Sequence, residues 1–441
     1  MIKFINTRGD NLKKISPQLN ILLSFIALIL IGSILLMLPF ATKVSNYTFL
    51  DSLFTATTSV TITGLTTIDV YATYTVFGKI VIALLIQLGG LSITTLMLFV
   101  LTIVGAKIGF GSRDLMSENI SLSSRVGIVK LVKKIVILTF IIEFIGAVIF
   151  TSIFISEGEM FFSALGKGVF HSISSYNNAG ITIFSGANSI MNYNTNPLFM
   201  LTTIALIILG GIGTIVVFDV IENKRWNRLK PHSKIVIKMT LILLVIGFVF
   251  VYFTEDNVSI LNSIFHSTTL RTAGFYSIDY SNVKAATLVV MIMLMFIGGS
   301  PASTAGGIKV TTLYTLIKVT SGKMNHKESL VYGRKISEDY KNKALMTLIV
   351  TLGISIIGII LIALFDNKVG LDKIVFEVVS AISNTGLTLN LTNTLSSYSK
   401  IVIILLMIIG RVSAITFISA FIFKRSNDTI STDYLDQSYL V

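Results

Sequence analysis

The stretch SVTITGLTT, residues 59–67, alternates β-branched residues with hydroxyls around one glycine, Gly64. Apolar stretches long enough to cross a membrane lie on either side of it, at 21–40 and 76–104. The segment that ends at the glycine, 51–63, would cover about 20 Å as a helix, which is too short to span a bilayer. It is therefore predicted to be a re-entrant half-helix that enters the membrane and turns back.

Three other segments of the chain resemble this one. Aligned on the glycine, the four read FTATTSVTITGL, FHSISSYNNAGI, FHSTTLRTAGF and FEVVSAISNTGL. The spacing from phenylalanine to glycine is ten residues in three copies and nine in the third. The predicted half-helices are 51–63, 163–179, 259–273 and 372–385, each beginning near a capping residue: Asp51, Ser163, Ser259 and Asp372. The leading aromatics are Phe54, Phe170, Phe265 and Phe376, and the glycines are Gly64, Gly180, Gly274 and Gly386.

Composition indicates a polytopic membrane protein. Of the 441 residues, 53% are hydrophobic and 13% are charged, with a mean hydropathy of +0.83. An average soluble domain carries about a quarter charged residues. The chain has no cysteine, which excludes disulfides, thiolate metal sites and a catalytic thiol. It also has no phosphate loop, nucleophile elbow or zinc motif, so an enzyme is not expected.

The net charge of +13 is distributed unevenly between the two sides of the predicted spans. Of the 35 Lys and Arg residues, 25 lie on one side, eight on the other and two within spans. This bias is typical of cytoplasmic loops, so both termini are predicted to be cytoplasmic. The basic runs flank spans and lack interleaved aromatics, which argues against nucleic-acid binding. The first apolar segment lacks a clean cleavage site and is interpreted as a retained signal anchor.

Each half-helix lies between two spans, which gives four similar units. Some 24 to 30 residues after each half-helix glycine, a further glycine is predicted to break the second span: Gly89, Gly210, Gly298 and Gly410. Because every unit has two spans, all four enter and leave on the cytoplasmic side. The predicted spans are 21–40, 76–104, 129–155, 198–221, 234–253, 284–298 with a broken continuation, 343–365 and 399–423.

The predicted fold is an all-α polytopic membrane protein with four parallel span–half-helix–span repeats around a central pseudo-fourfold ion pore. The predicted parts are a cytoplasmic N-terminal segment (1–20), repeats at 21–105, 106–222, 223–320 and 321–425, and a cytoplasmic tail (426–441).

Four glycine turns around one axis favour a cation pore. Non-helical backbone at membrane depth is tolerated where it is buried in protein or lines a water-filled path. The carboxyl ends of the half-helices point at the centre, where carbonyls can replace a cation's water shell. A single glycine in an apolar protein is more often a packing residue, but four matched copies favour the pore. The neighbouring polar residues Thr63, Asn178, Thr272 and Asn384 are expected to brace the turns.

These features resemble the Trk/Ktr/HKT superfamily of potassium transport proteins, in particular its KtrB-type membrane subunit. The resemblance covers about residues 20–425, and the N-terminus lacks the additional pair of spans of the longer TrkH type. Some plant relatives that prefer sodium have serine at the first filter glycine; Gly64 is present here, so the resemblance implies potassium. It implies a filter made of backbone oxygens at Ile62, Thr63, Gly64, Asn178, Ala179, Gly180, Thr272, Ala273, Gly274, Asn384, Thr385 and Gly386.

The third repeat contains a run with too many breakers for a continuous helix. A kink near a helix end is the alternative, but its place in the repeat favours a gating loop, as in KtrB-like proteins. Arg411 stands where the other repeats have a second glycine and is predicted to face the pore and tether this loop; a snorkelling or capping arginine is the alternative. The predicted gate comprises Arg411 and Gly298, Gly299, Ser300, Pro301, Ala302, Ser303, Thr304, Ala305, Gly306 and Gly307.

Four further residues are candidates for weaker roles. His171 and His266 lack a third ligand at metal spacing and are interpreted as packing residues at the outer rim. Glu143 is expected to pair between helices and is assigned no role. Arg271, three residues before Gly274, is expected to brace the outer side of the filter.

The predicted function is channel-like potassium uptake across a bacterial plasma membrane; the alternative is a sodium-coupled carrier or a sodium-selective relative. No cofactor is expected in the chain. K+ is the transported ion, and Na+ is left open as an activator. Besides the lipid bilayer, the resemblance implies a homodimer resting on a cytosolic ring of Ktr-type regulatory subunits that bind ATP or ADP. The basic loops 107–134 and 318–343 are the expected docking surface for that ring.

Gly64→Ser is expected to weaken discrimination of potassium over sodium and to leave the fold intact, because the turn carbonyls would be displaced rather than lost. Potassium and sodium fluxes in liposomes measure the ratio. Unaltered selectivity would count against the filter assignment.

Overall fold

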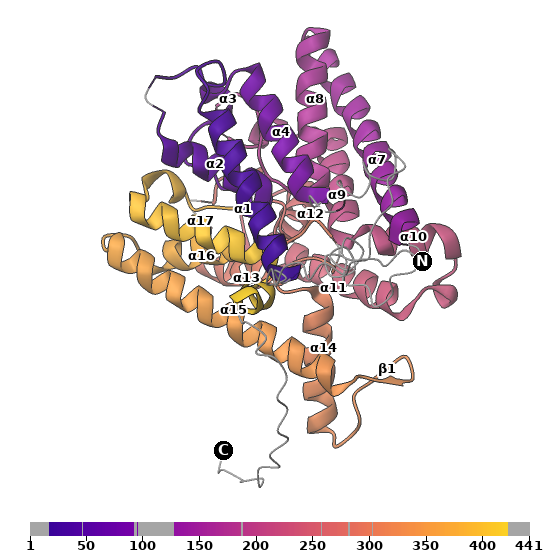
Figure 1. Ribbon diagram of the computed structural model, residues 1–441. Helices are drawn as coiled ribbons and strands as arrows, with labels where there is room; N and C mark the ends of the chain where they lie inside the picture. Colours follow the sequence, from indigo (N-terminus) through magenta and orange to yellow (C-terminus); the bar gives the residue numbers. More distant parts are fainter. Residues whose placement is uncertain are drawn as a thin grey trace, which may run out of the picture.

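The computed structural model describes residues 17–45, 47–91, 95, 128–186, 188–256, 258–280, 283–301 and 303–421. Over these ranges the chain is mostly helical, as the sequence predicts (Figure 1). The described strands are β1 (Leu330–Val331) and β2 (Arg334–Lys335), which pair in a hairpin that the sequence does not predict. The tail 426–441 and residues 107–127 of the first basic loop lie outside the described residues, and the N-terminal segment 1–20 is described from residue 17 onward.

Four long helices correspond to the first span of each predicted repeat. They are α1 (Pro17–Leu36), α7 (Ile128–Ser156), α11 (Pro231–Thr254) and α15 (Glu338–Phe365). By length and composition, these four helices of the described chain can each cross a membrane. Each is followed by a shorter helix: α2 (Phe49–Thr61), α8 (Phe161–Tyr176), α12 (Ile260–Thr269) and α16 (Leu371–Ile382).

A third set of helices comes next in each repeat. It comprises α4 (Val76–Leu91), α9 (Pro197–Ile212), α13 (Ala285–Phe296) and α17 (Ser397–Val412). In the described part of the chain, α9, α13 and α17 are continued by α10 (Thr214–Asn223), α14 (Val310–Met324) and α18 (Ala414–Phe421). The short connecting helices are α3 (Val70–Thr73), η1 (Met191–Tyr193), η2 (Trp226–Arg228) and η4 (Thr392–Thr394).

The second span of the second repeat is more sharply bent than expected, and most of the predicted span 76–104 beyond Leu91 lies outside the described residues. Helices α9 and α10 meet at 96°, so they form a broken span or re-entrant element rather than a straight helix. The predicted breaks at Gly89, Gly210 and Gly410 are misplaced, because all three glycines lie inside helices. In the second and fourth repeats the breaks come three residues later, at Gly213 and Ser413, which have φ of 89° and 79°. Backbone in that region cannot continue a right-handed helix.

The glycines inside these helices allow a close approach to the shorter helices. A Cβ atom added to Gly89 would lie 2.0 Å from the Val60 carbonyl oxygen. The corresponding distances are 1.9 Å from Gly210 to Tyr176 and 2.1 Å from Gly410 to Ile382. Each of these carbonyls belongs to the last turn of α2, α8 or α16. Glycine is therefore needed because no side chain fits between the two backbones.

The short helices begin slightly differently from the prediction. Ser259 is the N-cap of α12, as expected, and its hydroxyl accepts a hydrogen bond from the Asn262 amide at 3.2 Å. In α2 the cap is Thr48, which binds the Asp51 amide, so Asp51 lies in the first turn. The caps of α8 and α16 are Met160 and Gly370 rather than Ser163 and Asp372.

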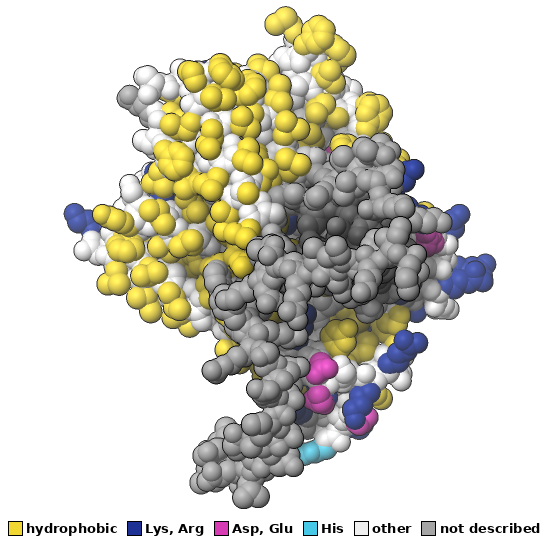
Figure 2. All heavy atoms as spheres, in the orientation of Figure 1, with side chains coloured by type: hydrophobic (Ala, Val, Ile, Leu, Met, Phe, Trp, Pro, Cys, Tyr) yellow, Lys and Arg dark blue, Asp and Glu magenta, His cyan; other side chains and the backbone are white. Residues whose placement is uncertain are grey.

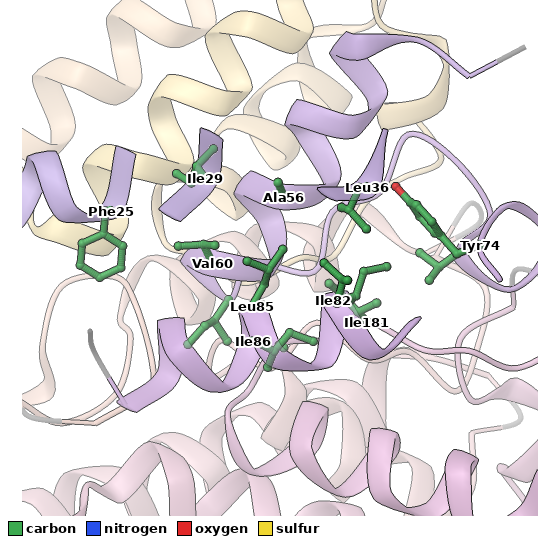
Figure 3. Packing of buried hydrophobic residues seen from close by; sticks show 14 of the residues in the cluster. Phe25, Ile29, Leu36, Ala56, Val60, Tyr74, Ile82, Leu85, Ile86 and Ile181 are labelled. Atoms are coloured by element: carbon green, nitrogen blue, oxygen red, sulfur yellow. The ribbon is translucent and has the colours of Figure 1, made fainter. Parts of the chain in front are cut away.

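The first core cluster lies between α1, α2 and α4. Figure 3 shows Ile29, Ala56, Val60 and Leu85 in this cluster, with Ile181, from the loop after α8, beside Ile82. A residue next to the second glycine loop is therefore buried in the core of the first repeat. The repeats interlock around the loops and do not stand as separate domains.

The outside of the molecule is apolar over wide areas, as Figure 2 shows for one face. Large side chains on the long helices point outward, among them Phe144 (69% exposed) on α7 and Phe253 (77%) on α11. Patches of this extent are uncommon on soluble monomers and fit a surface in contact with lipid. Helix α14 and the β1–β2 hairpin extend away from the other helices at the bottom of Figure 1.

Gly210→Ala is expected to lower the free energy of unfolding by roughly 1–3 kcal/mol, because the methyl group would overlap the Tyr176 carbonyl. Thermal unfolding in detergent measures the loss. Gly353→Ala on α15 is the matched control, since a Cβ there meets nothing within 4 Å. An equal melting temperature for both variants would contradict the close packing.

Candidate functional site

The four loops after the short helices share one unusual backbone conformation. Two residues before each glycine, the chain takes a left-handed φ: 58° at Ile62, 59° at Asn178, 68° at Thr272 and 51° at Asn384. The glycines themselves also have positive φ: 101° at Gly64, 66° at Gly180, 78° at Gly274 and 87° at Gly386. A left-handed φ is rare for β-branched residues such as Ile62 and Thr272. Such strain persists only where the surroundings enforce it.

The four glycines meet in a closed ring, although 94 or more residues separate each from the next. A Cβ atom added to Gly64 would lie 2.8 Å from the Ala179 oxygen. From Gly180 the corresponding distance to the Ala273 oxygen is 2.7 Å. We call these four glycines, with the carbonyl-bearing residue before each, the glycine ring.

The other two contacts close the ring. A Cβ atom on Gly274 would lie 2.6 Å from the Thr385 oxygen, and one on Gly386 would lie 2.0 Å from the Thr63 oxygen. Each glycine therefore touches the carbonyl of the residue before the next glycine, and the last contact returns to the first loop. The filter residues predicted from sequence are thus brought together at one place, with four backbone carbonyls among them.

Hydroxyl groups of the preceding helices hold the loops in this conformation. Thr58 accepts a hydrogen bond from the Gly64 amide at 2.9 Å, and Ser380 accepts one from the Gly386 amide at 3.0 Å. Ser174 and Thr269 instead donate to carbonyls just after their glycines, those of Ile181 and Phe275, both at 2.6 Å. The sequence reasoning missed these hydroxyls; a Ser or Thr six residues before each of the four glycines was the available signal, although in the third loop the hydroxyl that bonds is the next one, on Thr269.

The bracing predicted for residues inside the loops is found in two of four cases. The Asn384 amide donates to the Thr63 hydroxyl at 2.9 Å, which ties the fourth loop to the first. The side-chain atoms of Asn178 and the Thr272 hydroxyl are buried and have no hydrogen-bond partner among the described residues. The loops are therefore held mainly by hydroxyls behind them, in the last helical turn.

The run from Gly298 to Gly307, which we call the broken segment, separates α13 from α14. Ala302 within it lies outside the described residues. The two ends of the segment lie side by side: the Gly298 amide donates to the Ile308 carbonyl at 2.9 Å. Between them the Ser300 amide donates to the Gly211 carbonyl at 3.1 Å, on α9. The segment is thus a loop folded against the second repeat.

The broken segment also packs against the base of the fourth loop. A Cβ atom added to Gly306 would lie 2.3 Å from the carbonyl oxygen of Ser383, the residue after α16. Arg411 donates to the Thr304 carbonyl and to the Gly89 carbonyl, both at 2.6 Å. Its guanidinium therefore joins the broken segment to α4 from a position on α17.

The two buried histidines pack among aromatic and polar side chains. His171 stacks on Phe199, with ring centroids 4.8 Å apart, and His266 hydrogen-bonds with Ser277 and Tyr280. Sequence reasoning missed Glu377, which follows the repeat phenylalanine of α16 as the histidines follow theirs. Its buried carboxylate accepts hydrogen bonds from Thr388, at 2.7 Å, and Thr392, just after the fourth loop.

Glu143 and Arg271 have defined partners. Glu143 on α7 accepts from Gln87 on α4 at 3.0 Å and from Asn177, next to the second loop, at 2.9 Å, so the predicted pairing between helices is present. The Arg271 guanidinium donates to the Gly298 carbonyl at 2.9 Å. This contact is with the broken segment, rather than with the outer side of the loops as predicted.

Apolar helices surrounding converging glycine loops define a multi-pass membrane transport protein. The chain belongs to the TrkH family of cation transport proteins, whose profile matches residues 14–432. The resemblance found in the sequence is thereby confirmed. Since this is a transport family, the membership agrees with the prediction that the chain is not an enzyme.

Several named relatives match nearly the full chain. A potassium/sodium uptake protein, NtpJ, of Enterococcus hirae is 35% identical over 97% of this chain and 98% of its own. The Ktr system potassium uptake protein B of Bacillus subtilis is 36% identical over 92% of this chain and 93% of its own. The crystal structure of the potassium transporter TrkH from Vibrio parahaemolyticus superposes with a TM-score of 0.73 at 18% identity. It covers 94% of this chain and 86% of that protein, which shows a shared fold.

Thr58→Val is expected to reduce the ratio of potassium to sodium transport, because the partly buried Gly64 amide would lose its acceptor at a cost of about 1 kcal/mol. Fluxes of both ions in liposomes measure the ratio. Thr57→Val is the matched control, since the Thr57 hydroxyl bonds back to Leu53 in the same helix. Equal ratios in the two variants would show that the hydroxyl behind the loop does not matter.

Proposed function

We propose that the chain is a channel-like subunit for potassium uptake and that the glycine ring is its selectivity filter. The observation that carries this proposal is the cyclic contact of the four glycines with the carbonyls of Thr63, Ala179, Ala273 and Thr385. Loops that belong to four separate parts of the chain present the same backbone to one centre. In the proposed pore, twelve residues at 62–64, 178–180, 272–274 and 384–386 form the filter.

The chemistry of this centre suits a cation that has lost its water shell. Backbone carbonyls bear partial negative charge and can replace the oxygens of that shell. The carboxyl ends of α2, α8, α12 and α16 adjoin the ring and add the negative ends of four helix dipoles. In the proposed filter, a cation is thereby stabilised by carbonyl oxygens and helix dipoles.

Potassium is the proposed ion because the named relatives of B. subtilis and V. parahaemolyticus are potassium proteins and Gly64 is present. The second candidate is a sodium-coupled or sodium-permeable transporter. The name of the E. hirae relative, a potassium/sodium uptake protein, favours keeping it. In this candidate the same ring would serve both ions, or Na+ would act as an activator.

The broken segment and Arg411 are the proposed gate. The segment rests against Ser383 at the base of the fourth loop. In the proposed pore, it would obstruct the path out of the ring from this position. Arg411 holds it there through the Thr304 carbonyl. The charge of Arg411 would also repel cations, so opening requires both the segment and the guanidinium to move.

Partners and orientation are proposed from the charge pattern and the relatives' names. Two relatives are named as parts of a Ktr system, which supports a separate regulatory component. We place a nucleotide-binding ring against the basic surface of residues 318–343, formed by α14 and the hairpin, beneath a homodimer of this chain. Both termini then lie in the cytoplasm of a bacterial cell, in agreement with the excess of Lys and Arg there.

Expression in bacteria that lack potassium uptake tests the function. The chain is expected to restore growth on limiting potassium and to increase potassium influx. The double variant Gly64→Ser and Gly386→Ser is the control for the filter, because it is expected to lose discrimination of potassium over sodium. Sodium influx without rescue on potassium would overturn the choice of ion in favour of the second candidate.

Shortening residues 300–307 is expected to raise potassium flux, because the obstruction beneath the ring would be removed. Arg411→Ala should act in the same direction, since the tether to Thr304 is lost. Flux in proteoliposomes measures both. Unchanged flux in both variants would contradict the proposed gate.

A further inference from the structure

The third repeat departs from the packing rule of the other three. In repeats one, two and four, the helix glycine touches a carbonyl four residues before the ring glycine, as Gly89 touches Val60. The third counterpart, Gly298, instead has its nearest contacts within the broken segment, where a Cβ atom would lie 1.7 Å from the Gly306 oxygen. The direct backbone contact between helix and loop is thus replaced in this repeat.

Arg271 makes the connection in its place. It precedes the filter residue Thr272, and its guanidinium donates to the Gly298 carbonyl at 2.9 Å. The equivalent residues of the other loops are Thr61, Asn177 and Ser383, none of which carries a charge. The third loop is thus joined to the first residue of the broken segment by one long, charged side chain.

The surroundings of Arg271 offer too few partners for this residue to stabilise the fold. The side chain is only 6% exposed, and its Nε and Nη1 atoms have no partner among the described residues. No ion pair with an acidic residue is formed by it in the described part of the chain. A buried guanidinium with one hydrogen bond costs free energy, which points to a functional role.

Two further cations hold the same segment by the same chemistry. Lys309 donates to the Ala305 carbonyl at 2.6 Å, and Arg411 donates to the Thr304 carbonyl. The broken segment is thus held at its start by Arg271 and near its end by the other two. Hydrogen bonds from side chains can break and re-form, whereas the glycine contacts of the other repeats are fixed by close packing.

We propose that Arg271 is a positioning residue that latches the start of the broken segment to the third filter loop. This inference rests on the proposed function, in which the segment is the gate. When the latch is closed, the segment is held beside the ring, and movement of either part is transmitted to the other. When it opens, the segment is free to leave its place against Ser383.

The absence of cysteine from the chain allows a test that does not depend on flux. A single cysteine is introduced by Ser303→Cys, and its rate of modification by a water-soluble thiol reagent is measured in membranes. In this background, Arg271→Gln is expected to raise the rate by about tenfold or more, the factor that corresponds to one charge-assisted hydrogen bond. Arg271→Lys, which retains a donor, should restore a low rate.

Lys284→Gln is the matched control, because it removes a cation of the same repeat whose partner is the exposed Asp256. It should leave the rate unchanged. Elution as an intact species in detergent shows that each variant is folded. An unchanged rate in Arg271→Gln, or equal increases in Arg271→Gln and Lys284→Gln, overturns the latch.

Potassium flux measured on the same variants separates the latch from the proposed function. In protein with the full-length broken segment, Arg271→Gln is expected to raise potassium flux. In protein with residues 300–307 shortened, it is expected to raise the flux no further. Increased labelling in protein that carries no potassium would support the latch and contradict the pore. Potassium flux in the unaltered chain, together with unchanged labelling in Arg271→Gln, would support the pore and contradict the latch.

Discussion

The contact of each ring glycine with a carbonyl of the next loop is the constraint on which the rest of the structure depends. At distances of 2.0 to 2.8 Å from a Cβ position to an oxygen, no other residue fits without displacing backbone. Loops can approach this closely only if the helices behind them approach as well. The glycines of α4, α9 and α17 meet that requirement, because they let each helix touch the last turn of its short neighbour.

Backbone that leaves a helix inside an apolar protein must still satisfy its polar groups. In this chain the solution is local: serine and threonine hydroxyls on α2, α8, α12 and α16 bond the amides and carbonyls of the loops. This explains why the short helices are rich in hydroxyls although they are buried. Within SVTITGLTT itself, the hydroxyls of Thr61 and Thr63 hydrogen-bond with each other, and Thr63 also accepts a hydrogen bond from the Asn384 side chain. The Gly64 amide is bonded by Thr58, the residue just before this stretch.

The internal repeat in the sequence predicts the short helices, the four glycines and their convergence on one place. The prediction was possible because each copy of the repeat contains its own glycine spacing and its own alternation of apolar and hydroxyl residues. The break positions at Gly213 and Ser413 were missed, since they depend on where α10 and α18 must turn, and Ser413 gives no signal in its own residue type. The partner of Arg271 was also missed. Arg271 lies in a loop and its partner Gly298 lies 27 positions later, at the start of the broken segment. A contact of this kind depends on tertiary packing, which the repeat pattern does not encode.

The ring is closed by a single polypeptide, and its four sides differ in sequence around a shared backbone. A filter built from four identical subunits changes on every side when one codon changes. Here a substitution alters one quadrant and leaves the other three as internal references. The contribution of each side to the ring could therefore be measured separately, by substituting one, two, three or four sides in a single gene. No artificial linking of subunits is needed. Covalent continuity thus permits the asymmetry of the third quadrant, where a device found on only one side can evolve without being copied to the others.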